Sequence, residues 1–124
     1  EHNNAIRTIA QSLTSGGYFV IDYLNVHFAE EHLVPEEHIE AGGLDFYTKK
    51  WFDETHFYKR ITIEDEQLDA PVEFLEKVAK FSLGDFNDMF SYHQLQIQEV
   101  FGDYEFGKYD VRKSPRLIMI AKKI

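Results

Sequence analysis

The stretch that decides the fold is residues 13–24, which read LTSGGYFVIDYL. Before it, apolar residues recur at helical spacing and predict a helix with one buried face; they are Ala5, Ile6, Ile9, Ala10 and Leu13. Gly16 and Gly17 follow, and glycine readily adopts the left-handed conformation that ends a helix. Tyr18–Leu24 is β-prone and almost free of polar residues, as strands covered on both faces are. A helix, a glycine pair and a buried strand in this order predict a layered α/β arrangement.

The end of the sequence repeats this alternation of helix and strand. Ser82 followed by Asp85 is typical of a helix N-terminus, and apolar residues continue after it at helical spacing. Residues 95–101 predict a strand. After a loop, residues 116–122 are again nearly all apolar, so we expect a second strand that is covered on both faces.

The middle of the sequence, residues 25–81, is more polar. Dense charge over residues 25–40 predicts a loop with a short helix. Residues 45–53 and 56–64 are rich in aromatic and β-branched side chains, which predicts an antiparallel pair of strands. Residues 71–81 fit either a helix or a strand. Because a new helix begins at Ser82, we interpret them as the return strand of a hairpin with residues 56–64.

The composition excludes several classes of function. The 124 residues suit one domain, and a net charge of −9 opposes binding to nucleic acid or to anionic membranes. No apolar run is long enough to span a bilayer and no signal peptide is evident, so we expect a cytoplasmic protein without a membrane partner. The chain has no cysteine, which excludes disulfides and thiolate chemistry.

Three segments together carry a resemblance to a known family. Residues 13–21 read LTSGGYFVI, residues 83–104 contain LGDFNDMF and then LQIQEVFGDY, and residues 114–123 read SPRLIMIAKK. In this order they resemble the entry into the fifth strand, the last helix with the sixth strand, and the seventh strand of class I S-adenosylmethionine-dependent methyltransferases. The resemblance spans nearly the whole chain.

This resemblance implies an α/β fold that is the C-terminal part of a Rossmann-like methyltransferase domain. The implied sheet is mixed, with the strand order 18–24, 116–122, 95–101 and the last strand antiparallel and central. Residues 1–124 would form a single domain, which corresponds to the C-terminal portion of a methyltransferase domain. An insertion at about residues 25–81, which includes an antiparallel β-hairpin, would lie over the substrate side.

The resemblance also implies transfer of a methyl group from S-adenosylmethionine to an unknown acceptor. The family's glycine-rich loop and its ribose-binding acidic residue have no counterpart here. Gly42 and Gly43 do not replace that loop, because a strand and not a helix is predicted after them. We therefore expect a C-terminal half that lacks the main cofactor site and is inactive alone. The alternative is a standalone, non-enzymatic α+β module that binds a ligand or a partner.

The candidate substrate-binding residues fall in two groups. Asn25 follows the end of a predicted strand, where ligands bind in open α/β sheets, and its amide suits orienting an acceptor; it could equally satisfy the turn. His56 and Tyr58 alternate on one strand face as a possible general base or substrate contact, or as half-buried hairpin side chains. An apolar acceptor pocket could be lined by Trp51, Phe52, Phe57, Tyr58 and Tyr104, or these residues could form part of the core. No catalytic residue can be assigned from the sequence.

Two further expectations concern metals and partners. The spacing of His27, His32 and His38 matches no metal motif, so we expect no metal site. Tyr18–Leu24 would lack the strand that lies beside it in the family, and an unpaired apolar edge favours pairing with another chain. We therefore expect self-association around this strand.

Overall fold

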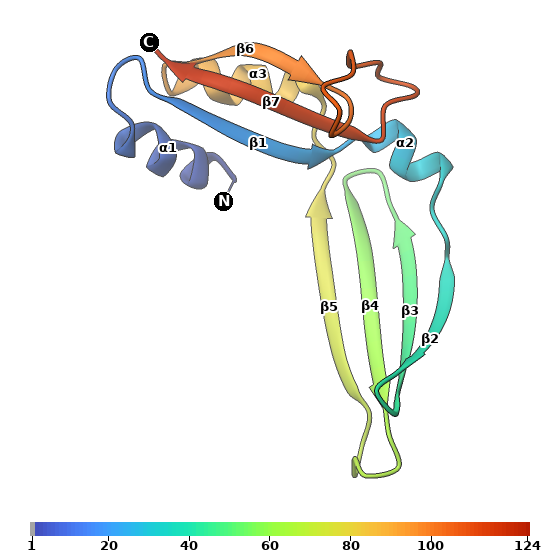
Figure 1. Ribbon diagram of the computed structural model, residues 1–124. Coiled ribbons are helices and arrows are strands. Elements are labelled where there is room, and N and C mark those ends of the chain that lie inside the picture. Colours follow the sequence, from blue (N-terminus) through green and yellow to red (C-terminus); the bar gives the residue numbers. More distant parts are fainter. Residues whose placement is uncertain (1) are drawn as a thin grey trace. The chain divides into compact units, whose positions relative to one another are not determined.

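A computed structural model describes residues 2–124, with side chains from residue 4 onward. The chain divides into two compact units (Figure 1), which we describe separately. Unit 1 combines the residues up to Ala29 with Phe81–Ile124, and unit 2 is Glu30–Lys80. Unit 2 therefore lies within residues 25–81, the range assigned to the insertion. The single-domain assignment stays a prediction.

Unit 1 is a three-stranded sheet with helices, in the strand order β1-β7-β6. This confirms the predicted order, with the last strand in the middle. Its strands are β1 (Tyr18–Leu24), β6 (Leu95–Phe101) and β7 (Arg116–Lys123). Its helices are α1 (His2–Ser12), α3 (Leu83–Tyr92) and the beginning of α2 (Val26–Glu31). No helix in the part of the chain that the structure describes is long and apolar enough to cross a membrane.

The prediction of a mixed sheet is wrong for this chain. Both β1 and β6 pair with β7 in antiparallel register, with Val20 opposite Ile120 and Val100 opposite Met119. β1 and β6 run in the same direction, but β7 lies between them, so the two strands that could form a parallel pair are not neighbours. All strand pairs in the described residues are consequently antiparallel.

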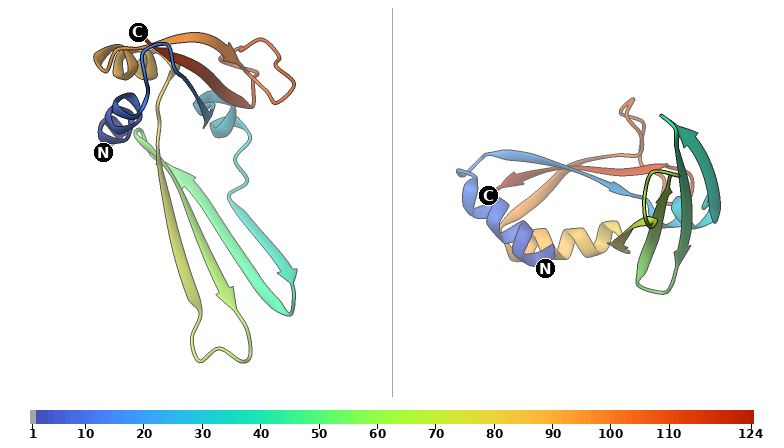
Figure 2. Two further views of the ribbon diagram at one scale, coloured as in Figure 1. Left: turned by 60° about the vertical axis from the view of Figure 1, so that its left-hand side comes forward. Right: turned by 90° about the horizontal axis from the view of Figure 1, so that it is seen from below.

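The core of unit 1 lies on one face of this sheet. Figure 2 shows α1 and α3 on the same side of the three strands. The largest fully buried side chains lie there, namely Phe90, Leu95, Leu117 and Met119. On the opposite face, Val20 is 61% exposed and Ile118 and Ile120 are only half-buried. The expected full cover on both faces of residues 18–24 and 116–122 is therefore not provided by the residues that the structure describes. The sequence pattern indicates that both faces are apolar, but it does not indicate what covers them.

The helix ends of unit 1 follow the predicted signals. Gly16 has a φ of +83° after α1, and the ammonium group of Lys123 donates hydrogen bonds to the carbonyls of Ala10 and Leu13 near the end of that helix. At the start of α3, Ser82 Oγ accepts from the Asp85 amide at 3.1 Å, and Asp85 Oδ2 accepts from the Ser82 amide at 2.9 Å. This reciprocal pair satisfies two backbone donors that the helix leaves free, so it fixes where α3 begins.

Unit 2 is a four-stranded antiparallel sheet in the order β2-β3-β4-β5 (Figure 1). Its strands are β2 (Glu36–Ala41), β3 (Leu44–Phe52), β4 (His56–Glu64) and β5 (Val72–Ala79). The predicted pairing of residues 45–53 with 56–64 and the interpretation of residues 71–81 as the return strand are confirmed.

Strand β2 (Glu36–Ala41) falls almost entirely within residues 25–40, for which the sequence predicts a loop with a short helix. Its sequence, EEHIEA, is dominated by charge and lacks the usual strand composition. The turn that follows supplies the missing signal. Gly42 and Gly43 have φ angles of +60° and +79°, and two successive residues with positive φ form the tight turn that joins antiparallel strands. The glycine pair therefore belongs to a hairpin.

Candidate functional site

Asn25 lies directly after β1 and is 3% exposed. Its side-chain amide nitrogen donates to the carbonyls of Val111 at 3.0 Å and Ser114 at 2.7 Å. Both N–H groups of the amide are thus used to hold the loop before β7 against the end of β1. The backbone carbonyl of Asn25 also accepts from Ala29 in the first turn of α2. These contacts give Asn25 a structural role, and a role in substrate binding stays a prediction.

A second cluster lies near the same end of β1. Asp22 accepts from the Tyr104 hydroxyl at 2.6 Å through Oδ2 and from Arg116 Nε at 2.9 Å through Oδ1. Its hydrogen bond with Asp22 raises the pKa of Tyr104, and desolvation acts in the same direction. Tyr104 therefore holds its proton and can act as a donor but not as a base. The ring itself is 68% exposed, so Tyr104 is not part of the core.

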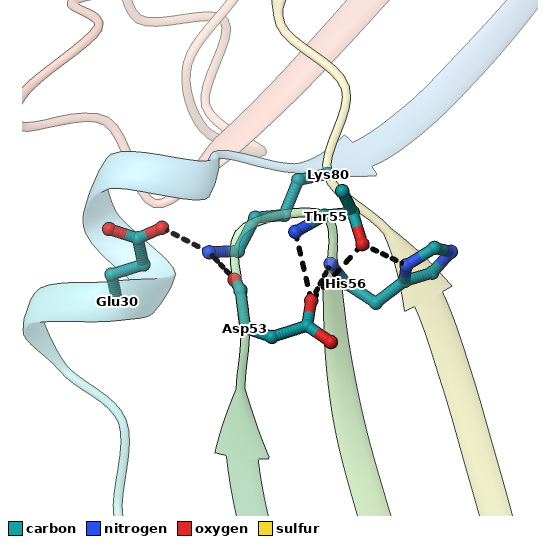
Figure 3. A network of polar contacts seen from close by, with 5 residues as sticks. All are labelled: Glu30, Asp53, Thr55, His56 and Lys80. Atoms are coloured by element: carbon teal, nitrogen blue, oxygen red, sulfur yellow. Dashed lines mark hydrogen bonds and ion pairs between the residues drawn. The ribbon is translucent and has the colours of Figure 1, made fainter.

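In unit 2, polar contacts converge on the turn between β3 and β4 (Figure 3). Asp53 Oδ1 accepts from the backbone amides of Thr55 and His56, both at 2.8 Å, and from Thr55 Oγ1 at 3.2 Å. Asp53 Oδ2 accepts from the Tyr58 hydroxyl at 2.7 Å. These hydrogen bonds, the one from Tyr58 foremost, hold the pKa of Asp53 well below its usual range, so this carboxylate is charged at neutral pH.

His56 is oriented by the same turn. Its Nδ1 lies 2.7 Å from Thr55 Oγ1, which in turn contacts Asp53. Tyr58 has a different role, because its hydrogen bond to Asp53 raises the pKa of the phenol. Tyr58 consequently keeps its proton at neutral pH and acts as a hydrogen-bond donor, not as a base. Of the two residues, His56 is therefore the candidate base, through a ring nitrogen.

Trp51 completes a cluster of aromatic side chains on this face of the sheet. The rings of Trp51 and Tyr58 are stacked with centroids 5.5 Å apart and an interplanar angle of 12°. Arg60 lies 5.8 Å from the Trp51 ring centroid, and Lys77 lies 6.0 Å from that of Tyr58. The result is an open aromatic surface flanked by two cations, with Trp51 40% exposed.

Lys80 is a cation of this region that the sequence did not indicate. Its Nζ donates to Glu30 Oε1 at 2.6 Å and to the carbonyl of Asp53 (Figure 3). The same ammonium lies 4.4 Å from the Phe52 ring centroid and 5.1 Å from that of Phe57. Its side chain is only 10% exposed, so the ion pair and the two rings replace most of its hydration. Lys80 thereby joins the end of the sheet to the residue that begins unit 2.

The structure thus brings together three of the five predicted substrate-side residues. Trp51, His56 and Tyr58 lie on one face of unit 2, whereas Asn25 and Tyr104 belong to unit 1. Phe52 and Phe57, proposed as pocket residues, form a pair on the opposite face of β3 and β4. Asp53 was missed as a site residue, although its position two residues before Thr55 is the usual signal for an Asx turn.

The described residues do not fit the cofactor that the fold implies. A cradle for S-adenosylmethionine needs a glycine turn between a strand and a helix. Gly42 and Gly43 join two strands, and Gly16 joins a helix to a strand. No metal-binding group of three or more His, Asp or Glu side chains occurs in residues 4–124.

Comparison with known proteins defines the class of fold. The sequence matches no protein-family model and no curated protein sequence. The structure matches the C-terminal half of class I S-adenosylmethionine-dependent methyltransferases over nearly the whole chain. Since the chain spans about half the length of the structures it matches, it has the fold of half of such an enzyme.

Three solved structures illustrate the match, and each covers 98% of this chain. A methyltransferase from Clostridium acetobutylicum ATCC 824 aligns with a TM-score of 0.79 and 14% identity, over 50% of its own length. The sugar N-methyltransferase KedS8 from Streptoalloteichus sp. ATCC 53650 gives 0.66 and 13%, over 48%. CalS10 from Micromonospora echinaspora, an amino pentose methyltransferase of calicheamicin biosynthesis determined with S-adenosylmethionine bound, gives 0.60 and 11%, over 50%.

Proposed function

We propose that this chain is the acceptor-side half of an S-adenosylmethionine-dependent methyltransferase, and that its acceptor is an amine on a sugar. The observation that carries the proposal is the match of 98% of the chain to methyltransferases that include a sugar N-methyltransferase and an amino pentose methyltransferase. The cofactor supplies the methyl group when bound. The residues of this chain bind and orient the acceptor.

The aromatic surface of unit 2 supports a sugar acceptor. The stacked rings of Trp51 and Tyr58 offer a flat apolar surface to the C–H face of a sugar ring. The polar groups that flank these two rings can form hydrogen bonds with the hydroxyl groups of the sugar, as the few polar groups of a ligand site do. In this role Trp51 and Tyr58 position the acceptor.

His56 is the best candidate for a general base in the described residues. An amine attacks a methyl group only in its neutral form, so a bound ammonium must first lose a proton. Thr55 Oγ1 donates to the charged Asp53, so the same oxygen is free to accept a hydrogen bond from the N–H of His56 Nδ1. That tautomer leaves Nε2 with a lone pair, which can take a proton from the acceptor.

The test is a methyl-transfer assay of the complete gene product that carries this chain, with S-adenosylmethionine and a panel of amino sugars. We expect the methyl group to be transferred to the amine nitrogen. We expect His56→Gln to lower kcat tenfold or more, and the loss to become smaller as the pH rises, because the amine then loses its proton without a base. His38→Gln is the matched control, since His38 lies on the same face and pairs with Asp45. Transfer to no amino sugar would disprove the acceptor, and an unchanged His56→Gln would disprove the base.

A standalone ligand-binding module is the second candidate, and the aromatic surface favours it because it needs no cofactor to bind a ring. If this second function is correct, this chain binds an amino sugar saturably, and the complete gene product transfers no methyl group under any condition of the same assay. Transfer would exclude it.

A further inference from the structure

Unit 1 has a groove beside its two longer helices, which Figure 2 shows on the same side of the sheet. The groove has a volume of about 490 Å³, which is within the range of small-molecule sites. Its lining comes from one face of α1, from the end of α3 with the turn after it, and from Lys123 of β7. We name it the α1–α3 groove.

The charge of the α1–α3 groove is opposite to that of the chain. The chain has 22 acidic side chains and 13 basic ones. None of the described residues that line the groove is an aspartate or a glutamate, whereas Arg7 and Lys123 provide two cations. A concave surface with charge of one sign concentrates ions of the opposite sign. The groove therefore favours an anion, although the net charge of the chain repels one.

Lys123 is held in place by the protein itself. Its Nζ donates to the carbonyl of Ala10 at 2.6 Å and to that of Leu13 at 2.9 Å. An ammonium group has three N–H donors, so these two bonds leave a third for a ligand. Because the side chain is already ordered, little further conformational entropy is lost when a ligand binds. Lys123 is thus a preorganised cation at one end of the groove.

The other polar groups of the groove are also donors. Arg7 and Gln11 lie one turn apart on the same face of α1, and Asn4 precedes them on that face. Gln94 adds a further side-chain amide from the turn after α3. The guanidinium group of Arg7 has the fork of N–H donors that matches the oxygens of a phosphate group.

We propose that the α1–α3 groove binds a small molecule that carries a phosphate monoester. Such a group has a charge of about −1.5 to −2 at pH 7 and three acceptor oxygens. Arg7 and Lys123 balance this charge, and the amide groups beside them can donate to the remaining oxygens. A single carboxylate has one charge and two oxygens, so it matches the two cations less well.

This site goes beyond the proposed methyl transfer and does not depend on it. The groove shares no residue with the candidate acceptor residues, and none of its lining belongs to unit 2. Lys122, next to Lys123, pairs with Tyr18 at the start of β1, whereas Asn25 follows the end of that strand. The seven residues of β1, at ~3.3 Å each, put about 20 Å between these two ends.

The experiment is an NMR titration of the isotope-labelled 124-residue chain with glucose 6-phosphate, with glucose and with citrate, each at constant ionic strength. Constant ionic strength separates binding from general screening of charge. We expect the backbone amide signals of Arg7, Gln11, His93 and Lys123 to shift and saturate with glucose 6-phosphate. Glucose should leave them unchanged, and citrate should bind about tenfold more weakly or worse.

Three variants locate the site, and well-dispersed spectra show that each is folded. Arg7→Gln removes a cation from the groove and Gln11→Glu adds an anion to it. Arg112→Gln is the matched control, because Arg112 is an exposed cation in the loop before β7 and does not line the groove. We expect Arg7→Gln and Gln11→Glu each to weaken binding of glucose 6-phosphate about tenfold or more, and Arg112→Gln to leave it unchanged.

Four results would overturn the proposal. They are shifts that do not saturate, citrate that binds as tightly as glucose 6-phosphate, undiminished binding by either groove variant, and an equal loss of binding in Arg112→Gln.

Discussion

At the scale of single residues, the role of a side chain follows from the hydrogen bonds that it makes to buried polar groups. Asn25 is the clearest case, since its amide satisfies two backbone carbonyls in a position that is 3% exposed. We expect Asn25→Ala to lower the free energy of unfolding by about 1–3 kcal/mol, because it leaves buried acceptors without donors. Chemical denaturation measures this. Asn87→Ala on the exposed side of α3 is the control, with a change within about 0.5 kcal/mol. An equally small effect at position 25 would show that water replaces the amide.

Asp53 gives the second residue-scale prediction, on acid stability. Its pKa in the folded chain is lowered from the ordinary 3.8, chiefly by the hydrogen bond from Tyr58. Its contribution to stability is therefore complete above pH 3.8 and is lost as the pH falls from there toward the folded pKa. We expect the loss of stability over this acid range to be smaller in Asp53→Asn than in the wild type, as followed by urea denaturation at several pH values. Parallel curves for the two proteins would contradict the prediction.

The residues of the candidate site were only partly predictable. The alternation of His56 and Tyr58 indicated a shared face, and Trp51 was recognised as an aromatic residue of the preceding strand, which pairs with theirs. The sequence did not show that Asp53 fixes the proton of Tyr58, because that depends on how the turn folds back. It also gave no sign of Lys80, whose pairing with Glu30 joins residues fifty positions apart.

At the scale of the elements, the start of α3 offers a direct test of a local signal. Ser82 and Asp85 exchange hydrogen bonds across the first turn of the helix. We expect Ser82→Ala to lower the free energy of unfolding by about 0.5–2 kcal/mol. Ser91→Ala, in the last turn of the same helix, is the matched control. If both variants were equally stable, the reciprocal capping bonds would contribute nothing measurable.

Elements with local signals were predicted, and those that depend on neighbours were not. The helix at residues 83–92 and the strand at 18–24 have caps, glycines or continuous apolar runs that act over a few residues. β2 has only one large apolar residue, Ile39, and is a strand because the Gly42–Gly43 turn lays it beside β3. The prediction of a mixed sheet was wrong although the strand order was right, because β7 lies antiparallel between β1 and β6 and leaves no parallel pair in the described residues.

At the scale of the whole molecule, the central claim is that this chain holds the acceptor side of a methyltransferase and not the cofactor side. Calorimetric titration of the 124-residue chain with S-adenosylmethionine tests it most directly. We predict no saturable heat, because the few contacts left without a glycine turn and a ribose carboxylate cannot offset the entropy lost when a flexible cofactor is immobilised. We also predict binding by the complete gene product. A one-to-one isotherm in the micromolar range with this chain alone would contradict the claim.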